Sequence, residues 1–217
     1  MLKPIQIIPT LFATTEAEYQ KRLDQLNASE LFQEGWVQLD LMDNKFVPNK
    51  SIGLDVIKKN PPPFQKEAQL MVLDPDEWLE GLFELKVDRI ILPVEIDKNI
   101  LDFMNLIQDN NIEVGLSLNP ETDSEALNAY LDLLDSVLLM GVKPGFENQQ
   151  LDLGIYDKIK IIKQEIPSLR VGVDGGVNNT NIKELVNAGV DYLAIGSYLF
   201  TGDFDENLER LWETLYE

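Results

Sequence analysis

Short apolar segments rich in β-branched residues recur eight times along this sequence, and segments with a helical pattern separate them. Their starts lie roughly 25 residues apart, which is about what a strand, two loops and a crossover helix need. Strictly alternating strands and helices are typical of a parallel sheet. The expected strands are residues 5–9, 37–42, 67–72, 89–94, 113–118, 136–142, 170–174 and 192–195.

The segments between these strands are expected to be helical. Asp74 and Pro75, with acidic residues after them, predict a helix start, because proline fits the first helical turn. Gly189 directly after Ala188 is typical of a helix end. One helix is expected to begin near residue 74, and the others to cover residues 16–31, 99–108, 124–134, 157–165, 181–188 and 205–216.

Eight strand–helix units in 217 residues predict a (β/α)8 TIM barrel, with residues 1–217 forming a single domain. The main alternative is an open, doubly wound sheet, which usually has a glycine-rich first turn between strand and helix. Here that turn reads Pro9-Thr-Leu-Phe-Ala13, so the sequence favours the barrel.

The composition limits the partners and the chemistry. Eighteen Lys and Arg against 38 Asp and Glu give a net charge of −20, which argues against nucleic acid and anionic membranes. No apolar run has the length of a membrane span, and no signal-peptide pattern begins the chain, so we expect a cytoplasmic location. Without Cys or His, the chain has no thiol, no disulfide and no imidazole for proton transfer or metal binding. The oligomeric state stays open, with a homo-oligomer as one expectation.

Two aspartates occupy apolar strands. Asp40 points to the same side as Gln38 and Met42, because side chains alternate along a strand, and Asp174 ends the strand Val171-Gly-Val-Asp174. A buried carboxylate is costly unless something pairs with it, and local hydrogen bonding is the simplest interpretation. In a barrel, however, both would lie at the same mouth. Two carboxylates that flank one carbon suit proton removal on one face and proton delivery on the other.

Glycines and methionines also cluster at the expected strand ends. In this fold the loops after strands seven and eight often bind phosphate through backbone N–H groups. Each glycine alone is typical of an ordinary turn, but together they favour a phosphate cradle, a name we use for Gly175, Gly176, Gly196 and Ser197. The methionines either fill gaps in the core or line a small-substrate pocket; they are Met42, Met71 and Met140.

An ordered set of motifs runs through nearly the whole chain. They are Ile8-Pro-Thr10, Asp40-Leu-Met-Asp43, Phe46-Val-Pro-Asn49, Gln69-Leu-Met-Val72, Leu118-Asn-Pro120, Met140-Gly-Val-Lys-Pro-Gly-Phe146, Val173-Asp-Gly-Gly-Val177 and Gly196-Ser-Tyr-Leu-Phe200. Together they resemble the ribulose-phosphate 3-epimerase family. The resemblance implies a ribulose-phosphate-binding barrel and interconversion of ribulose 5-phosphate and xylulose 5-phosphate, a step of the pentose phosphate pathway. It also implies a divalent metal held by two His and two Asp.

The resemblance assigns roles to individual residues. Asp40 and Asp174 become the catalytic acid–base pair, and with Gln38 and Gln69 they occupy the metal-binding positions. The phosphorylated ketose is expected to contact Thr10, Gln69, Met42, Met71, Met140, Gly145, Phe146, Glu147, Asn148, Gly175, Gly176, Gly196 and Ser197.

Two departures from the family pattern fall within the expected site. Gln38 and Gln69 stand where the resemblance places histidines; their amide oxygens would suit Mg²⁺, Mn²⁺ or Ca²⁺ rather than Zn²⁺. Neutral amides bind such cations weakly, so we expect an empty or weakly occupied metal site. Glu147 puts a carboxylate near the expected phosphate, which predicts weak phosphate binding.

Two functions therefore stay open. One is 3-epimerisation of a ketopentose phosphate or of a related ketose phosphate. The other is a catalytically impaired family member that binds a phosphosugar or a protein partner without turnover.

Overall fold

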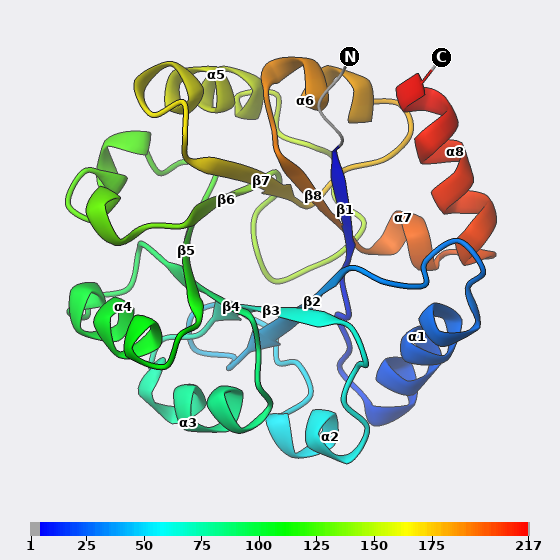
Figure 1. Ribbon diagram of the computed structural model, residues 1–217, viewed down its shortest axis with the longest axis horizontal. Coiled ribbons are helices and arrows are strands. Elements are labelled where there is room, and N and C mark those ends of the chain that lie inside the picture. The colour runs from blue at the N-terminus through cyan, green and yellow to red at the C-terminus, as the bar shows by residue number, and fades with distance from the viewer. Residues whose placement is uncertain (1–4, 217) are drawn as a thin grey trace.

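The computed structural model describes residues 5–216, and its eight strands form one parallel sheet in the order β1-β8-β7-β6-β5-β4-β3-β2. The ring closes between β1 and β2, where Thr10 forms a parallel bridge with Gln38 and the Leu11 amide donates to the Gln38 carbonyl at 2.7 Å. Figure 1 shows the strands around a central axis with the helices outside them. The chain is therefore a (β/α)8 barrel, as predicted. The strands are β1 (Gln6–Pro9), β2 (Trp36–Met42), β3 (Gln65–Met71), β4 (Arg89–Pro93), β5 (Glu113–Leu118), β6 (Ser136–Met140), β7 (Arg170–Asp174) and β8 (Tyr192–Ile195).

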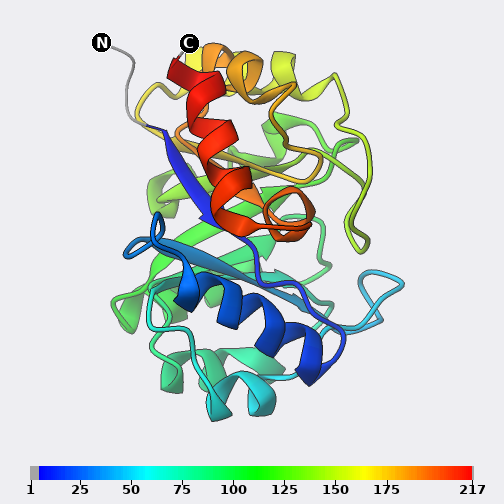
Figure 2. The same ribbon diagram turned by 90° about the vertical axis from the view of Figure 1, so that its right-hand side faces the viewer.

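The helices cover the outside of this ring (Figure 2). They are α1 (Glu16–Ala28), α2 (Leu54–Lys59), α3 (Asp76–Glu84), α4 (Ile100–Asp109), α5 (Ile155–Glu165), α6 (Ile182–Ala188), α7 (Ser197–Phe200) and α8 (Phe204–Tyr216). No helix of residues 5–216 has both the length and the apolar character that a membrane span requires.

The helix expected over residues 124–134 is wrong. The structure has two short 3-10 turns there, η1 (Ser124–Leu127) and η2 (Leu131–Leu133). Between them Tyr130 has φ −122° and ψ −4°, outside the helical region. The segment before these turns is held instead by Lys158, whose ammonium group donates to the carbonyls of Asn119, Pro120 and Thr122.

Alternation along each strand separates two cores. On β2, Leu39 and Leu41 face the helices and are 1% exposed, whereas Gln38, Asp40 and Met42 point into the barrel. The outer core is completed by helix side chains such as Tyr19 and Leu23 of α1. Burial of this apolar surface between sheet and helices is the main force that holds the barrel together.

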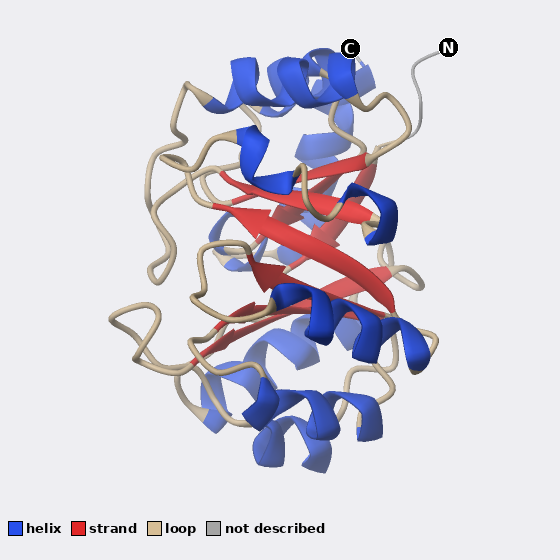
Figure 3. Cartoon of the chain, turned by 90° about the vertical axis from the view of Figure 1, so that its left-hand side faces the viewer, coloured by secondary structure: helices blue, strands red, loops and turns tan. Residues whose placement is uncertain are grey.

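The barrel interior is filled below the site. Ile8, Ile91, Leu138 and Tyr192 form a buried layer across it. A Cβ atom on Gly172 would lie 2.1 Å from Tyr192 Cζ, so the tyrosine ring requires glycine there. The strands point toward the side where the long loops gather (Figure 3), and this side is left to form a pocket.

Candidate functional site

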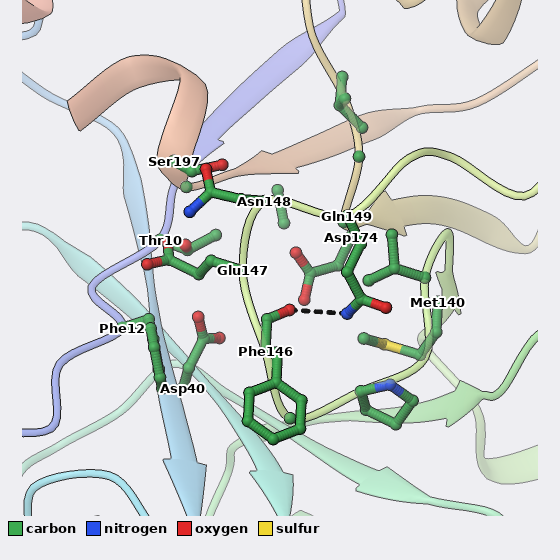
Figure 4. A pocket seen from close by; sticks show the side chains of 18 of the residues that line it. Thr10, Phe12, Asp40, Met140, Phe146, Glu147, Asn148, Gln149, Asp174 and Ser197 are labelled. Atoms are coloured by element: carbon green, nitrogen blue, oxygen red, sulfur yellow. Dashed lines mark hydrogen bonds between the residues drawn. The ribbon is translucent and has the colours of Figure 1, made fainter. Parts of the chain in front are cut away.

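A pocket of about 570 Å³, its open mouth included, lies at the carboxyl ends of the strands. Its walls come from β2, β3, β6, β7 and β8 and from the segments that follow β1, β6, β7 and β8. Figure 4 shows Asp40 and Asp174 in the pocket, with Glu147 and Asn148 drawn above Asp40 and Phe146 between the two aspartates in this view. Of the residues expected at the site, the pocket brings together Thr10, Asp40, Met42, Met71, Met140, Gly145, Phe146, Glu147, Asn148, Asp174, Gly175, Gly176, Gly196 and Ser197.

Gln38 and Gln69 do not line this pocket. Both side chains are fully buried, and they lie against the two aspartates. Gln38 Nε2 lies 2.6 Å from Asp40 Oδ1, 3.2 Å from Asp174 Oδ2 and 2.9 Å from Gln69 Oε1. With its amide turned by half a rotation, Gln69 would present its nitrogen at 3.1 Å from Asp40 Oδ1 and 2.8 Å from Asp174 Oδ2, but also at 2.9 Å from Gln38 Nε2. In either orientation of Gln69, the Gln38 amide nitrogen bridges the two carboxylates.

This arrangement does not fit a tightly bound divalent cation. A cation held by Asp40 and Asp174 would have to face both carboxylates, and the Gln38 amide nitrogen takes that position with its donor side. Hard cations need oxygen ligands, and in this structure Gln38 turns its amide nitrogen, not its oxygen, toward the two carboxylates. Within residues 5–216 no three His, Cys, Asp or Glu side chains come together as a metal site.

Burial controls the protonation of the aspartates. It raises the pKa of Asp40 to about 7, helped by the negative charge of Glu147 and opposed by the Gln38 hydrogen bond and by Arg22. Burial also raises the pKa of Asp174 well above its usual value, and the nearby Asp40 charge adds to this. Each charge disfavours the other, so the pair favours a state in which at least one of the two carboxyl groups keeps its proton. A carboxylate and a carboxylic acid facing the same pocket is one such state.

The glycines of the phosphate cradle have conformations or contacts that exclude larger residues. Gly175 has φ +95° and Gly176 has φ +73°, a region that favours glycine. A Cβ on Gly176 would lie 2.7 Å from the Leu151 amide nitrogen, and one on Gly196 would lie 2.5 Å from Thr10 Oγ1. The backbone of these residues therefore borders the pocket directly.

The methionines pack in the core and also border the pocket. Met42 and Met71 pack with Val47, Phe12 and Phe46 in one apolar cluster and also line the pocket. Met140 borders the pocket from β6, and its sulfur lies 2.9 Å from Gln69 Nε2.

Sequence reasoning missed a cation beside the pocket. Arg22 of α1 forms a 2.7 Å ion pair with Glu147 Oε2. A carboxylate beside a phosphate loop indicates that a basic partner is needed, but the two residues are 125 positions apart, so the sequence does not say which. The other missed lining residues sit next to predicted ones; they are Phe12, Val142, Pro144, Gln149, Val177, Ala194 and Ile195.

Comparisons with known proteins agree with the motifs. The model of the ribulose-phosphate 3 epimerase family matches residues 6–200. The chain belongs to this family. Ribulose-phosphate 3-epimerase of Helicobacter pylori (strain ATCC 700392 / 26695) is 33% identical over 202 residues, which cover 90% of this chain and 91% of that protein. The enzyme of the same name from Chlamydia muridarum is 31% identical over 175 residues, 77% of each chain.

Solved structures show the same fold at lower identity. A 3-hexulose-6-phosphate synthase superimposes with a TM-score of 0.71 at 18% identity, over 97% of this chain and 100% of that one. A mutant tryptophan synthase α-subunit from Pyrococcus furiosus gives a TM-score of 0.72 at 17% identity, over 98% of this chain and 100% of that one. Both similarities show that the fold is shared, and they say nothing about the reaction.

Proposed function

We propose that this family member epimerises a ketopentose phosphate at C3, interconverting ribulose 5-phosphate and xylulose 5-phosphate or a closely related pair. One observation carries the proposal: Asp40 of β2, which is buried, and Asp174 of β7, which is half-buried, line one pocket from separate strands, and both have raised pKa values. Family membership supports epimerase chemistry in general.

The proposed reaction uses the state in which the pair holds one proton. The ionised carboxylate removes the proton from C3. This leaves an enediolate that spans C3 and the former ketone carbon. The protonated carboxylic acid then delivers its proton to C3 from the opposite face, and the configuration is inverted. The partners exchange protonation states in one turnover, and a pair whose pKa values are both raised suits this exchange.

The amides of Gln38 and Gln69 are proposed to position the pair without a metal. Gln38 holds Asp40 and Asp174 through its N–H donors and Gln69 packs against the Gln38 amide, so acid–base function would not depend on an added cation. A neutral amide stabilises a developing enediolate less than a Lewis acid does. We therefore expect slow turnover that chelators do not change.

The test is an assay with ribulose 5-phosphate in D₂O, with NMR detection of deuterium at C3 and of xylulose 5-phosphate. Loss of a general acid or base costs roughly 10²–10⁴-fold in rate, so Asp40→Asn and Asp174→Asn should each lose that much. Asp109→Asn, which removes an exposed charge on α4, is the matched control and should keep full activity. EDTA should leave the rate unchanged.

A second candidate is a barrel that binds a phosphosugar without turnover. It is favoured by the amide contacts to both carboxylates and by Glu147 in the pocket, which together lower the reactivity expected of the site. Absence of C3 exchange in the wild type, with and without Mg²⁺, Mn²⁺ or Zn²⁺, would support this candidate and contradict the epimerase.

Further expectations from the sequence stay proposals. They are a single domain over residues 1–217, of which 1–4 and 217 lie outside the described part, a cytoplasmic location, a homo-oligomer, and the lack of nucleic-acid or membrane partners.

A further inference from the structure

Glu147 places a negative charge inside the phosphate cradle. A Cβ atom on Gly196 would lie 3.0 Å from Glu147 Oε1. This oxygen is buried and has no hydrogen-bond partner, whereas Oε2 lies 2.7 Å from an Arg22 guanidinium nitrogen. Figure 4 shows the carboxylate beside Thr10, between Asp40 and Ser197. The side chain thus fills space that a phosphate group would need.

Arg22 is held independently of Glu147. Its Nη1 donates to the Thr10 carbonyl at 3.2 Å, and its guanidinium group lies 5.0 Å from the centre of the Phe200 ring. Its side chain is only 15% exposed. Removal of the Glu147 carboxylate would therefore leave a positioned guanidinium group at the edge of the cradle, and guanidinium groups bind phosphate well.

The loop that carries Glu147 is fixed on both sides of it but not at it. Gln149 Nε2 donates to the carbonyls of Lys143 and Phe146 at 2.7 and 2.8 Å, and Asn49 Nδ2 donates to the Gly145 carbonyl at 2.8 Å. The hydrogen bonds described for the Glu147 side chain lead to Arg22 alone. The carboxylate can therefore move while the loop stays in place.

Space for a displaced Glu147 carboxylate lies beside the main pocket. A second hollow shares Phe12, Glu147, Asn148 and Ser197 with the main pocket, and its wall on α1 carries Lys21 and Arg22 as well as Glu18. Rotation into this hollow would clear the cradle, and two cations against one acid on this wall would still leave Glu147 near positive charge.

We propose that Glu147 is an exchangeable internal anion and that Arg22 is a phosphate-binding residue of this chain: a phosphate ester displaces the Glu147 carboxylate from the cradle and takes over its contact with Arg22. This inference rests on the proposed function for the class of substrate. It makes Glu147 a selectivity residue, because a ligand without a phosphate cannot replace the carboxylate.

The test is a double-mutant cycle on binding, which needs no turnover. Inorganic phosphate and ribulose 5-phosphate are titrated by calorimetry into the wild type, Glu147→Gln, Arg22→Gln and the double variant. Glu147→Gln should bind both ligands roughly tenfold more tightly, because the competing charge is gone. Arg22→Gln should weaken binding, and in the double variant it should reverse most of the gain. Exposed Glu165→Gln and Arg210→Gln repeat the charge changes away from the pocket and should change affinity little.

Two outcomes would overturn the inference. Unchanged or weaker binding by Glu147→Gln would mean that the ion pair is a fixed wall of the pocket. Equal affinities of Glu147→Gln and the double variant would mean simple repulsion, with no role for Arg22. Glu147→Ala, which also empties the space, should tighten binding as well, and thermal unfolding checks that each variant is folded.

Failure here differs from failure of the proposed function. Tighter phosphate binding by Glu147→Gln without C3 exchange in any variant would retain the ion-pair inference and reject the epimerase. C3 exchange in the wild type, together with unaltered phosphate affinity of Glu147→Gln, would retain the epimerase and reject the ion-pair inference.

Discussion

Asp40 carries its carboxyl group where ionisation is costly. It is 6% exposed and faces Asp174, Glu147 and Glu67, all acidic, with Arg22 as the nearby cation that favours its charge. Its pKa of about 7 lies above the unfolded value of 3.8, so the folded protein holds a proton that the unfolded chain has lost. The stabilising effect of this proton is complete below pH 4 and is lost as the pH rises through 7.

Asp40→Asn should therefore stabilise the protein at pH 8 and not at pH 4. The expected gain is up to roughly 4 kcal/mol, since each pKa unit corresponds to about 1.4 kcal/mol. Urea unfolding at several pH values measures it, and the gain should grow between pH 4 and pH 8. Asp109→Asn should show no such slope, and a slope equal to that of the control would contradict a raised pKa.

The sequence predicted part of the site residue by residue. Asp40, Asp174 and the cradle glycines could be predicted because each belongs to a short motif at the end of an apolar strand. Arg22 could not be predicted as a site residue, because the closure of the barrel creates its contact with Glu147 and no local sequence pattern encodes that contact. The direction of the Gln38 and Gln69 amides toward the aspartates likewise depends on packing between strands.

At the level of elements, strands were easier to predict than helices. Buried parallel strands are nearly continuous apolar runs, so β5, β7 and β8 begin and end where expected. α2 and α7 were not predicted, because six and four residues are too few to show a helical period. The opposite error concerns residues 124–134. Their composition predicted a helix, but the structure has two 3-10 turns there.

The floor of the barrel carries two ion pairs that share Arg89 and link three neighbouring strands. Arg89 at the start of β4 lies 2.7 Å from Glu67 of β3 and 2.7 Å from Glu113 of β5, and its guanidinium group stacks 4.4 Å from the Trp36 ring. Arg89 and Glu67 are completely buried. Burial raises the pKa of Glu67 to about 7, and the Arg89 charge opposes this.

Arg89→Met should destabilise the protein by about 3–5 kcal/mol at pH 8, because it leaves the Glu67 carboxylate buried without its cation. Urea unfolding measures the loss. Glu67→Gln in the same chain should restore much of it, since the unpaired charge is then gone. An equally large loss in the double variant would show that shape, and not charge, determines stability here.

For the molecule as a whole, the net charge of −20 opposes an anionic ligand at long range. Phosphate binding must then depend on local groups such as the cradle backbone and Arg22. The barrel itself followed from the sequence because eight strand–helix units leave few topologies. Closure between β1 and β2, by contrast, rests on the Thr10–Gln38 bridge, which no sequence pattern marks.

Added salt should speed the association of ribulose 5-phosphate. Raising the NaCl concentration from about 10 to about 150 mM shortens the Debye length from roughly 30 to 8 Å and screens the repulsion. We expect the association rate constant, or kcat/KM, to rise roughly threefold. Ribulose without its phosphate is the control and should show no trend, and a falling rate for the phosphate ester would indicate local attraction at the mouth.

The filled floor of the barrel determines by which side a ligand can reach the aspartates. Ile8, Ile91, Leu138 and Tyr192 fill the barrel beneath the aspartates, with Arg89 and Glu67 buried below them. In the part of the chain that the structure describes, the pocket opens on the side of the loop that carries Phe146 and Glu147. A ligand that reaches Asp40 and Asp174 enters and leaves on that side, so a bound molecule excludes the next one. On the proposed function, a sugar phosphate and its epimer would compete for one entrance.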